Sequence, residues 1–135
     1  MKTFDVQSIE LSVPRQSAFE FIANPATLPR WTSAFANVTG STASLRTPNG
    51  EVKINLAVRS SIESGTVDWI MTFPDGSIAT AFSRVVETDR ERCVYSFVLT
   101  PPPVPLEQLE GALEAQSITL AEELRCLKSI LEAHE

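Results

Sequence analysis

Three polar side chains, Thr80, Arg84 and Tyr95, interrupt the apolar strands predicted in the middle of this sequence, and they are the residues best suited to chemistry. Arg84 and Tyr95 each share a parity with the hydrophobic residues of their own strands. An arginine beside a tyrosine can hold a carboxylate or a carbonyl through charge-assisted hydrogen bonds. Alternatively, Arg84 lays its stem on apolar surface with its guanidinium in water, and Tyr95 reaches solvent at a sheet edge.

Nucleophilic and metal chemistry have few candidate residues. The only histidine is His134, in the penultimate position, so no Ser-His-Asp triad is expected. Cys93 and Cys126 lack metal-ligand spacing, and we expect free, buried thiols, no metal and no cofactor. An acid–base reaction would rely on Tyr95, Arg84 and ordered water, with a cavity orienting the substrate.

Alternating hydrophobic residues predict six strands between residues 35 and 100. They cover residues 36–41, 43–47, 52–58, 67–73, 78–86 and 93–99. Two-residue turns at Asn49-Gly50 and Asp75-Gly76 would fix the register of two hairpins.

The turn at Asn49-Gly50 places Leu45 opposite Ile54. The turn at Asp75-Gly76 places Met71 opposite Thr80, Trp69 opposite Phe82 and Val67 opposite Arg84. A weaker turn signal at Asp89-Arg90 places Arg84 opposite Tyr95 and Phe82 opposite Phe97.

The predicted registers gather large side chains on one face of the sheet, which we expect to line a cavity. The candidate ligand-binding residues, including two from a terminal helix, are Trp31, Leu56, Trp69, Met71, Thr80, Phe82, Arg84, Tyr95, Phe97, Ala112 and Gln116.

After Pro105, leucines recur at helical spacing and predict one helix of about 28 residues, roughly 40 Å long. The leucine stripe has a gap where Gln116 and Ser117 occupy core positions, with Ala112 close before them. This gap could border a cavity, with Gln116 offering its amide to a ligand. Alternatively, small helical residues pack closely against Trp69 or Trp31.

The amino-terminal segment predicts a strand followed by two short helices. Residues 3–13 alternate with a phase slip near Ser8, which predicts a β-bulge. Pro14 suits the start of a helix, and Asn24-Pro25 ends that helix. We expect Trp31, after a second helical piece, to be largely buried and to close one end of the cavity or core.

The segment VPRQSAFEFIANPATLPRW, residues 13–31, resembles the opening of the START-related SRPBCC superfamily, which includes polyketide cyclase-like proteins and the birch-pollen allergen fold. The order of the later elements agrees with it. The resemblance implies one α+β domain over residues 1–135 with a helix-grip fold: a seven-stranded curved antiparallel sheet wrapped around a long C-terminal helix, with an apolar cavity between them. The chain lacks the glycine-rich loop of the plant allergens and the Rieske cysteine-histidine pattern.

Composition and charge narrow the classes of partner. The net charge of −6 and the pI near 4.8 oppose nucleic-acid binding. No apolar run reaches the roughly 18 residues of a membrane span. The alternating amino terminus is unlike a signal peptide, so we expect a cytoplasmic protein with no membrane insertion. Nothing in the sequence predicts an oligomeric state.

Three functions are compatible with these features. The leading hypothesis is noncatalytic binding of a small hydrophobic or aromatic ligand, lipid- or polyketide-like, between sheet and helix. The alternatives are a polyketide cyclase or aromatase-like enzyme, and a protein-interaction module with no small ligand. Fold alone does not choose among them.

Overall fold

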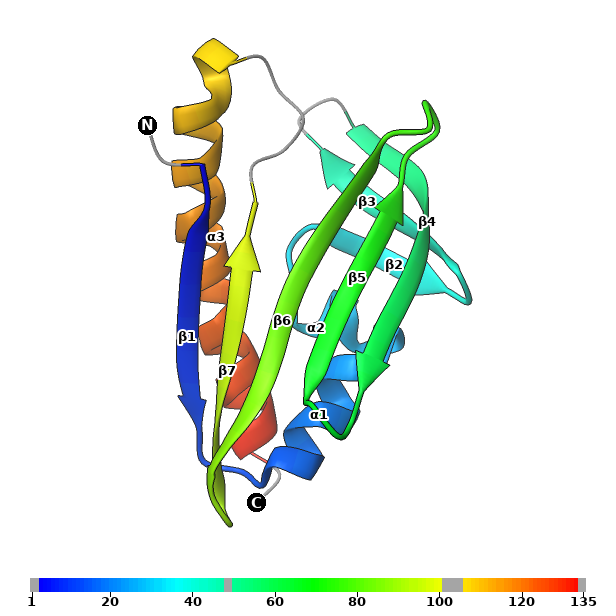
Figure 1. The fold of residues 1–135 in the computed structure, drawn as a ribbon. Coiled ribbons are helices and arrows are strands. Elements are labelled where there is room, and N and C mark those ends of the chain that lie inside the picture. Colours follow the sequence, from blue (N-terminus) through cyan, green and yellow to red (C-terminus); the bar gives the residue numbers. More distant parts are fainter. Residues whose placement is uncertain (1–2, 48–49, 101–105, 134–135) are drawn as a thin grey trace.

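The computed structural model describes residues 3–47, 50–100 and 106–133, without the side chains of residues 47 and 106–113. The described chain forms a seven-stranded antiparallel sheet and a long terminal helix (Figure 1). Its elements are β1 (Asp5–Leu11), α1 (Arg15–Ala23), the 3₁₀ turn η1 (Pro25–Thr27), α2 (Leu28–Trp31), β2 (Phe35–Thr39), β3 (Thr42–Thr47), β4 (Gly50–Ser61), β5 (Thr66–Thr72), β6 (Ile78–Asp89), β7 (Arg92–Leu99) and α3 (Leu106–Glu132).

The strands lie in the order β1-β7-β6-β5-β4-β3-β2, so the first strand forms one edge and the second strand the other. Figure 1 shows α3 running along one face of the sheet behind β1 and β7, with α1 and α2 on the same face. We call this covered face the inner face and the opposite one the outer face. The arrangement confirms the predicted α+β helix-grip architecture.

The proline-rich segment after α1 folds as a tight corner. The Asn24 side chain accepts a hydrogen bond from the Ala26 N–H (3.1 Å), and the Thr27 hydroxyl lies 2.8 Å from the Phe21 carbonyl oxygen. Because proline disfavours the helical region at the residue before it, α1 ends before Asn24-Pro25. The corner delivers Trp31 into the core with only 3% of its surface exposed, which confirms its predicted burial.

The core lies between the inner face and the helices. Its fully or almost fully buried members come from every layer and include Leu11, Ile22, Leu28, Ile54, Val67, Val85, Leu124 and Leu127. Cys93 is buried as predicted, whereas Cys126 is exposed, because it lies on the side of α3 away from the buried leucines.

The predicted β-bulge in the first strand is wrong. β1 pairs with β7 without interruption from Asp5–Leu99 to Leu11–Cys93. Val6 lies on the outer face and is half exposed, while Ile9 and Leu11 lie on the inner face. The apparent phase slip arises because the inner face of β1 changes from apolar to polar at Gln7 and Asp5.

The predicted register between β5 and β6 is also wrong, by one residue. The loop contains five residues, closed by hydrogen bonds from the Phe73 N–H to the Ser77 carbonyl and from the Gly76 N–H to the Phe73 carbonyl, both 2.9 Å. Thr72 therefore pairs with Ile78, and Trp69 pairs with Ala81 instead of Phe82. A one-residue shift moves every side chain of a strand to the other face.

The β6–β7 register also differs from the prediction by one residue. Val85 lies opposite Tyr95, and Arg84 lies opposite Ser96, with an irregularity between Glu87 and Asp89. The predicted pairs Arg84–Tyr95 and Phe82–Phe97 do not form.

The register of the β3–β4 hairpin differs from the prediction by two residues. Leu45 pairs with Val52, and Ala43 pairs with Ile54. Since side chains alternate with a period of two, this shift keeps Leu45 and Ile54 on the inner face, where both are buried.

Among the described residues, no helix has the length and apolar character needed to cross a membrane.

Candidate functional site

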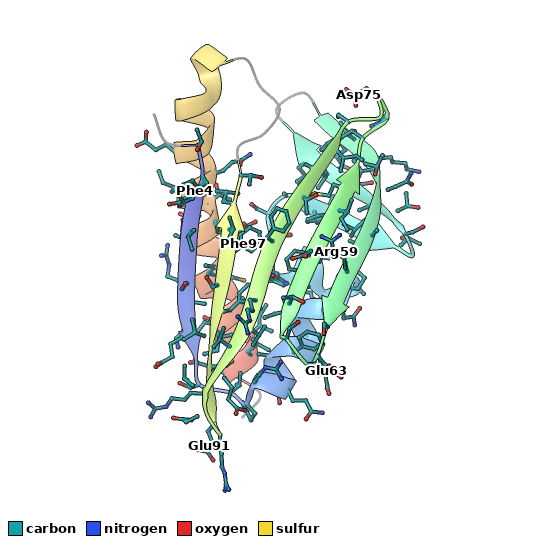
Figure 2. All side chains as sticks on the ribbon, in the orientation of Figure 1. Phe4, Arg59, Glu63, Asp75, Glu91 and Phe97 are labelled. Atoms are coloured by element: carbon teal, nitrogen blue, oxygen red, sulfur yellow. The ribbon has the colours of Figure 1, made fainter. Side chains whose placement is uncertain are left out.

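Four aromatic side chains meet at the centre of the inner face, and we call them the aromatic cluster: Trp31, Trp69, Tyr95 and Phe97. The Trp31 ring centroid lies 6.4 Å from that of Trp69 and 6.3 Å from that of Tyr95. Phe97, labelled on β7 in Figure 2, stacks on Trp69 at 6.1 Å and meets Tyr95 edge-on at 6.3 Å. These spacings lie within the range at which aromatic pairs attract.

Small side chains on β6 make room for the cluster. Ala81 lies opposite Trp69, and Ser83 lies opposite Phe97. Trp69 and Phe97 belong to β5 and β7, which flank β6, so their rings stack across this intervening strand. Small residues facing large ones on neighbouring strands fill the layer without overlap.

Three hydrogen-bond donors of the cluster are buried without a partner. They are the indole Nε1 atoms of Trp31 and Trp69 and the hydroxyl of Tyr95. Within the described part of the chain the two indoles have no hydrogen bond, and the Tyr95 hydroxyl has none of normal geometry, although the Ser83 side chain lies close enough to affect its pKa. The two indoles are 3% exposed, and Tyr95 is not exposed at all. Buried polar groups in folded proteins are nearly always satisfied, so three such donors in one cluster call for a partner from outside the chain, such as a ligand or a water molecule.

The phenol of Tyr95 stays protonated throughout the physiological range. Burial raises its pKa far above the usual value of 10, and a hydrogen-bonding interaction with the Ser83 side chain lowers it by a smaller amount. The negative charge of Asp68 raises the pKa further. Ser83 itself is 7% exposed and donates to the Val67 carbonyl at 2.6 Å.

Ser83 is a site residue that the sequence analysis missed. The available signal was the alternation of small residues Ala79, Ala81 and Ser83, which the larger Ile78 and Phe82 on the opposite parity obscured.

Contacts with α3 hold the element that carries Trp31. The Glu123 carboxylate accepts hydrogen bonds from the backbone N–H of Ser33 (2.6 Å) and from its hydroxyl (3.2 Å). Cys126 Sγ lies 3.7 Å from the Arg30 carbonyl oxygen. Burial raises the pKa of Glu123, while the Ser33 hydrogen bonds lower it by less. These contacts fix the end of α2 against α3 and position the Trp31 ring.

Two further predicted residues lie on the inner face beside the cluster. Leu56 is buried and pairs with Met71, which is partly buried and packs against the core. Both are placed to extend the apolar wall from the aromatic cluster along β4 and β5.

Three predicted residues lie on the outer face and are not part of this site. Thr80 is partly buried there, Phe82 is 41% exposed, and Arg84 is exposed with its Nε donating to the Ser64 carbonyl oxygen at 2.9 Å. The physical reason is the one-residue register shift of β6. Arg84 therefore cannot hold a ligand on the inner face.

Two predicted site residues belong to α3, and the structure describes the side chain of only one of them. The side chain of Ala112 lies outside the described residues, and Gln116 is partly buried. Next to it, the Ser117 hydroxyl donates to the Asp5 carboxylate, and Gln7 Nε2 donates to the Ser117 carbonyl oxygen at 2.7 Å and to Asp5 at 3.0 Å. The gap in the leucine stripe thus faces the polar part of β1.

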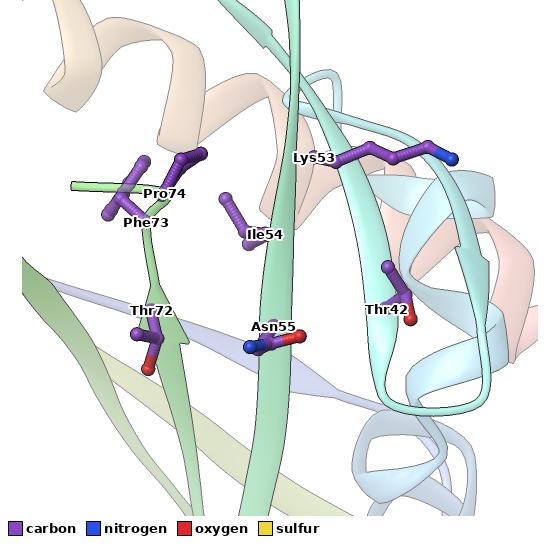
Figure 3. A pocket seen from close by; sticks show the side chains of 7 residues that line it. All are labelled: Thr42, Lys53, Ile54, Asn55, Thr72, Phe73 and Pro74. Carbon is purple, nitrogen blue, oxygen red and sulfur yellow. The ribbon is translucent and has the colours of Figure 1, made fainter. Parts of the chain in front are cut away.

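Two surface hollows lie away from the aromatic cluster, over β3, β4 and the strands beside them. One has a volume of about 120 Å³ and is shown in Figure 3, lined by Thr42, Lys53, Ile54, Asn55, Thr72, Phe73 and Pro74. The other, of about 290 Å³, is lined by Asn37, Thr39, Thr42, Ala43, Ser44 and Lys53. Neither hollow is lined by a residue of the aromatic cluster.

Comparison with known proteins finds similar structures but no similar sequence family. No protein-family model matches the chain, and no curated protein matches it. A START superfamily protein from Mycobacterium smegmatis has a TM-score of 0.71 at 8% identity, over 99% of this chain and 100% of that chain.

Two further solved structures extend this similarity. The protein XoxI from Bacillus cereus has a TM-score of 0.71 at 14% identity, covering 96% of each chain. The Zhui aromatase/cyclase from Streptomyces sp. R1128 has a TM-score of 0.68 at 10% identity, over 96% of this chain and 93% of that chain. The chain therefore has the START-like, polyketide cyclase-like helix-grip fold.

Proposed function

We propose that this protein binds a small hydrophobic or aromatic molecule, lipid- or polyketide-like, between the inner face of the sheet and α3. The ligand would rest on the aromatic cluster, with Leu56 and Met71 extending the apolar wall and Gln116 bordering it from the helix. Ligand sites in proteins are mostly apolar, with a few placed polar groups, and this surface has that character.

One observation carries the proposal: the aromatic cluster keeps three buried donors without a partner in the described chain. A side chain placed only for packing would cost less as phenylalanine, because a buried donor without a partner is destabilising. The START-like and aromatase/cyclase-like neighbours support the proposal through their shared fold.

Intrinsic fluorescence tests the proposal directly, because both tryptophans of the chain belong to the cluster. Titration with aromatic and fatty ligands should change the emission intensity and wavelength in a saturable manner. Native mass spectrometry of the purified protein should then find the same class of molecule co-purified.

The matched control is Phe82→Ala, on the outer face, which should leave the titration unchanged. Phe97→Leu, within the cluster, should weaken binding. No saturable response with any hydrophobic ligand, or equal weakening by both variants, would contradict the proposal.

The enzyme alternative is supported by one group, the Tyr95 hydroxyl. It is protonated and buried, and its interaction with Ser83 is not a hydrogen bond of normal geometry, so it could donate to a substrate carbonyl during cyclisation. Incubation with a linear poly-β-ketone thioester analogue, followed by product chromatography, tests this function. Loss of product in Tyr95→Phe with binding retained would favour the enzyme, whereas absence of product from the wild type would favour a carrier.

A further inference from the structure

The three buried donors of the aromatic cluster define which polar group a ligand should carry. We infer that the site selects hydrophobic molecules with an uncharged oxygen acceptor, such as a ketone or quinone oxygen, over the corresponding hydrocarbons. This inference rests on the proposed function and adds the chemical class of the ligand.

The donors leave no doubt about the direction of hydrogen bonding. An indole N–H can only donate, and the two indoles are the Trp31 and Trp69 groups without a partner in the described residues. The Tyr95 O–H can donate as well, since its phenol stays protonated. A ketone oxygen has two lone pairs, so one carbonyl can accept from two of these three groups.

The three groups belong to one place in the fold. Trp31 lies between Trp69 and Tyr95, with ring centroids 6.4 and 6.3 Å away. Tyr95 and Trp69 are joined through Phe97, which has no polar atom on its side chain. A flat molecule against these rings would place an oxygen near the donors while its hydrocarbon frame met Phe97, Leu56 and Met71.

The charge around the cluster favours a neutral acceptor over a carboxylate. Arg84 is on the outer face, where its Nε donates to Ser64. Two partly buried cations are engaged elsewhere: Arg15 donates to the carbonyls of Ile62 and Glu63, and Lys128 pairs with Glu132. Arg59 is on the outer face as well, where it pairs with Asp68 at 3.3 Å. An anion would therefore lose its hydration without gaining a cation.

Matched probes test this inference. We would titrate the wild-type protein with tetralin, 1-tetralone and tetralin-1-carboxylate, and with fluorene and 9-fluorenone as a larger pair, following tryptophan emission. Each ketone should bind about tenfold more tightly than its hydrocarbon, the ratio expected when a lone buried donor gains a partner. The carboxylate should bind more weakly than the ketone.

Variants assign the selectivity to the donors. Tyr95→Phe and Trp69→Phe should each lower the ketone-to-hydrocarbon ratio several-fold, with the hydrocarbon affinity of Tyr95→Phe little changed. Phe97→Leu is the control, because it alters the same cluster without removing a donor and should weaken both probes alike.

The outcomes separate the inference from the proposed function. If ketone and hydrocarbon bind equally, the donors are satisfied by bound water and the inference fails, while ligand binding stands. A ketone preference that survives unchanged in both donor variants also overturns it. If neither member of either pair binds, the proposed function fails together with the inference.

Discussion

The two described parts of α3 meet the sheet in opposite ways. In the carboxy-terminal part, Leu120, Leu124, Leu127 and Leu131 are all buried, and the contact is apolar packing. One turn earlier, Ser117 meets β1 through hydrogen bonds with Asp5 and Gln7. The leucine part supplies most of the stability through burial, whereas the polar part and the neighbouring aromatic cluster contain the groups that can interact with something other than the protein itself.

The largest effect should come from breaking the leucine part. Leu127 is fully buried, so Leu127→Ala should lower the free energy of unfolding by about 2–5 kcal/mol through lost burial and a residual cavity. Denaturant titration measures this loss. Ile118→Ala is the matched control on the same helix, because Ile118 is 61% exposed and its truncation should change stability little. Equal losses of stability in both variants would contradict the conclusion that the buried leucines of α3 supply most of its contribution.

Breaking the polar part should cost less. Ser117→Ala removes the hydroxyl that donates to Asp5 and should lower the free energy of unfolding by about 1 kcal/mol. Ser129→Ala, at an exposed position of the same helix, provides the control for helix propensity. A loss as large as that of Leu127→Ala would mean that the two parts contribute equally, against our interpretation.

Two glutamates of α3 should give opposite pH dependences. Burial raises the pKa of Glu123, so its protonated form favours the folded state, and its contribution is lost as the pH rises from 4.5 through the higher folded pKa. Hydrogen bonds from Lys128 and Ser12 lower the pKa of Glu132, so its contribution is present above 4.5 and is lost as the pH falls through the lower folded pKa.

Unfolding curves measured across this range in Glu123→Gln and Glu132→Gln test the two signs. Glu123→Gln should flatten the dependence on the high side of pH 4.5, and Glu132→Gln should flatten it on the low side. Changes on the same side of pH 4.5 in both variants would show that at least one sign is wrong.

The smallest effect is expected on the outer face. Arg84→Ala removes a side chain that is exposed and bonded to a backbone carbonyl, so the free energy of unfolding should change by no more than about 0.5 kcal/mol. Ligand affinity in the fluorescence titration should not change. A clear loss of affinity would support the sequence-based prediction, in which Arg84 lies beside Tyr95 on the ligand-binding face.

Much of the fold could be predicted from local patterns. The alternation in residues 67–73 placed Val67 and Trp69 on the apolar face, and Cys93 was expected to be buried; all three are buried. For Tyr95 the sequence left both the cavity and the solvent open, and the structure buries it completely. The proline corner predicted the burial of Trp31. Each of these inferences depended on the residues of one segment, where hydrophobic periodicity and turn chemistry agree.

The face of β6 could not be predicted in this way. Ile78, Phe82 and Val86 form the more hydrophobic parity, yet all three are exposed. The opposite parity faces inward because Trp69 and Phe97 need small neighbours, which is a property of the two adjacent strands. Asp75-Gly76 also fits both a two-residue turn and the observed five-residue loop, and the difference of one residue reverses the face.

The candidate site residues likewise divide into those whose face was predicted correctly and those on β6, whose face was not. Trp31, Leu56, Trp69, Met71, Tyr95 and Phe97 lie on the inner face as expected, whereas Thr80, Phe82 and Arg84 moved with β6. The role of the three donors depends on which hydrogen bonds the folded chain leaves unformed, and no sequence pattern carries that information.

The position of β1 has a consequence for the order of folding during synthesis. Asp5 pairs with Leu99, and Gln7 bonds to Ser117, so the first strand has no partner until the last third of the chain has been made. Tyr95 reaches the cluster from the same late segment. Contacts so distant in sequence slow folding, because the intervening chain must be closed into a loop first. We therefore expect β1 to remain unpaired during synthesis until β7 has been made. The site is then completed only after both β7 and α3 have been synthesised.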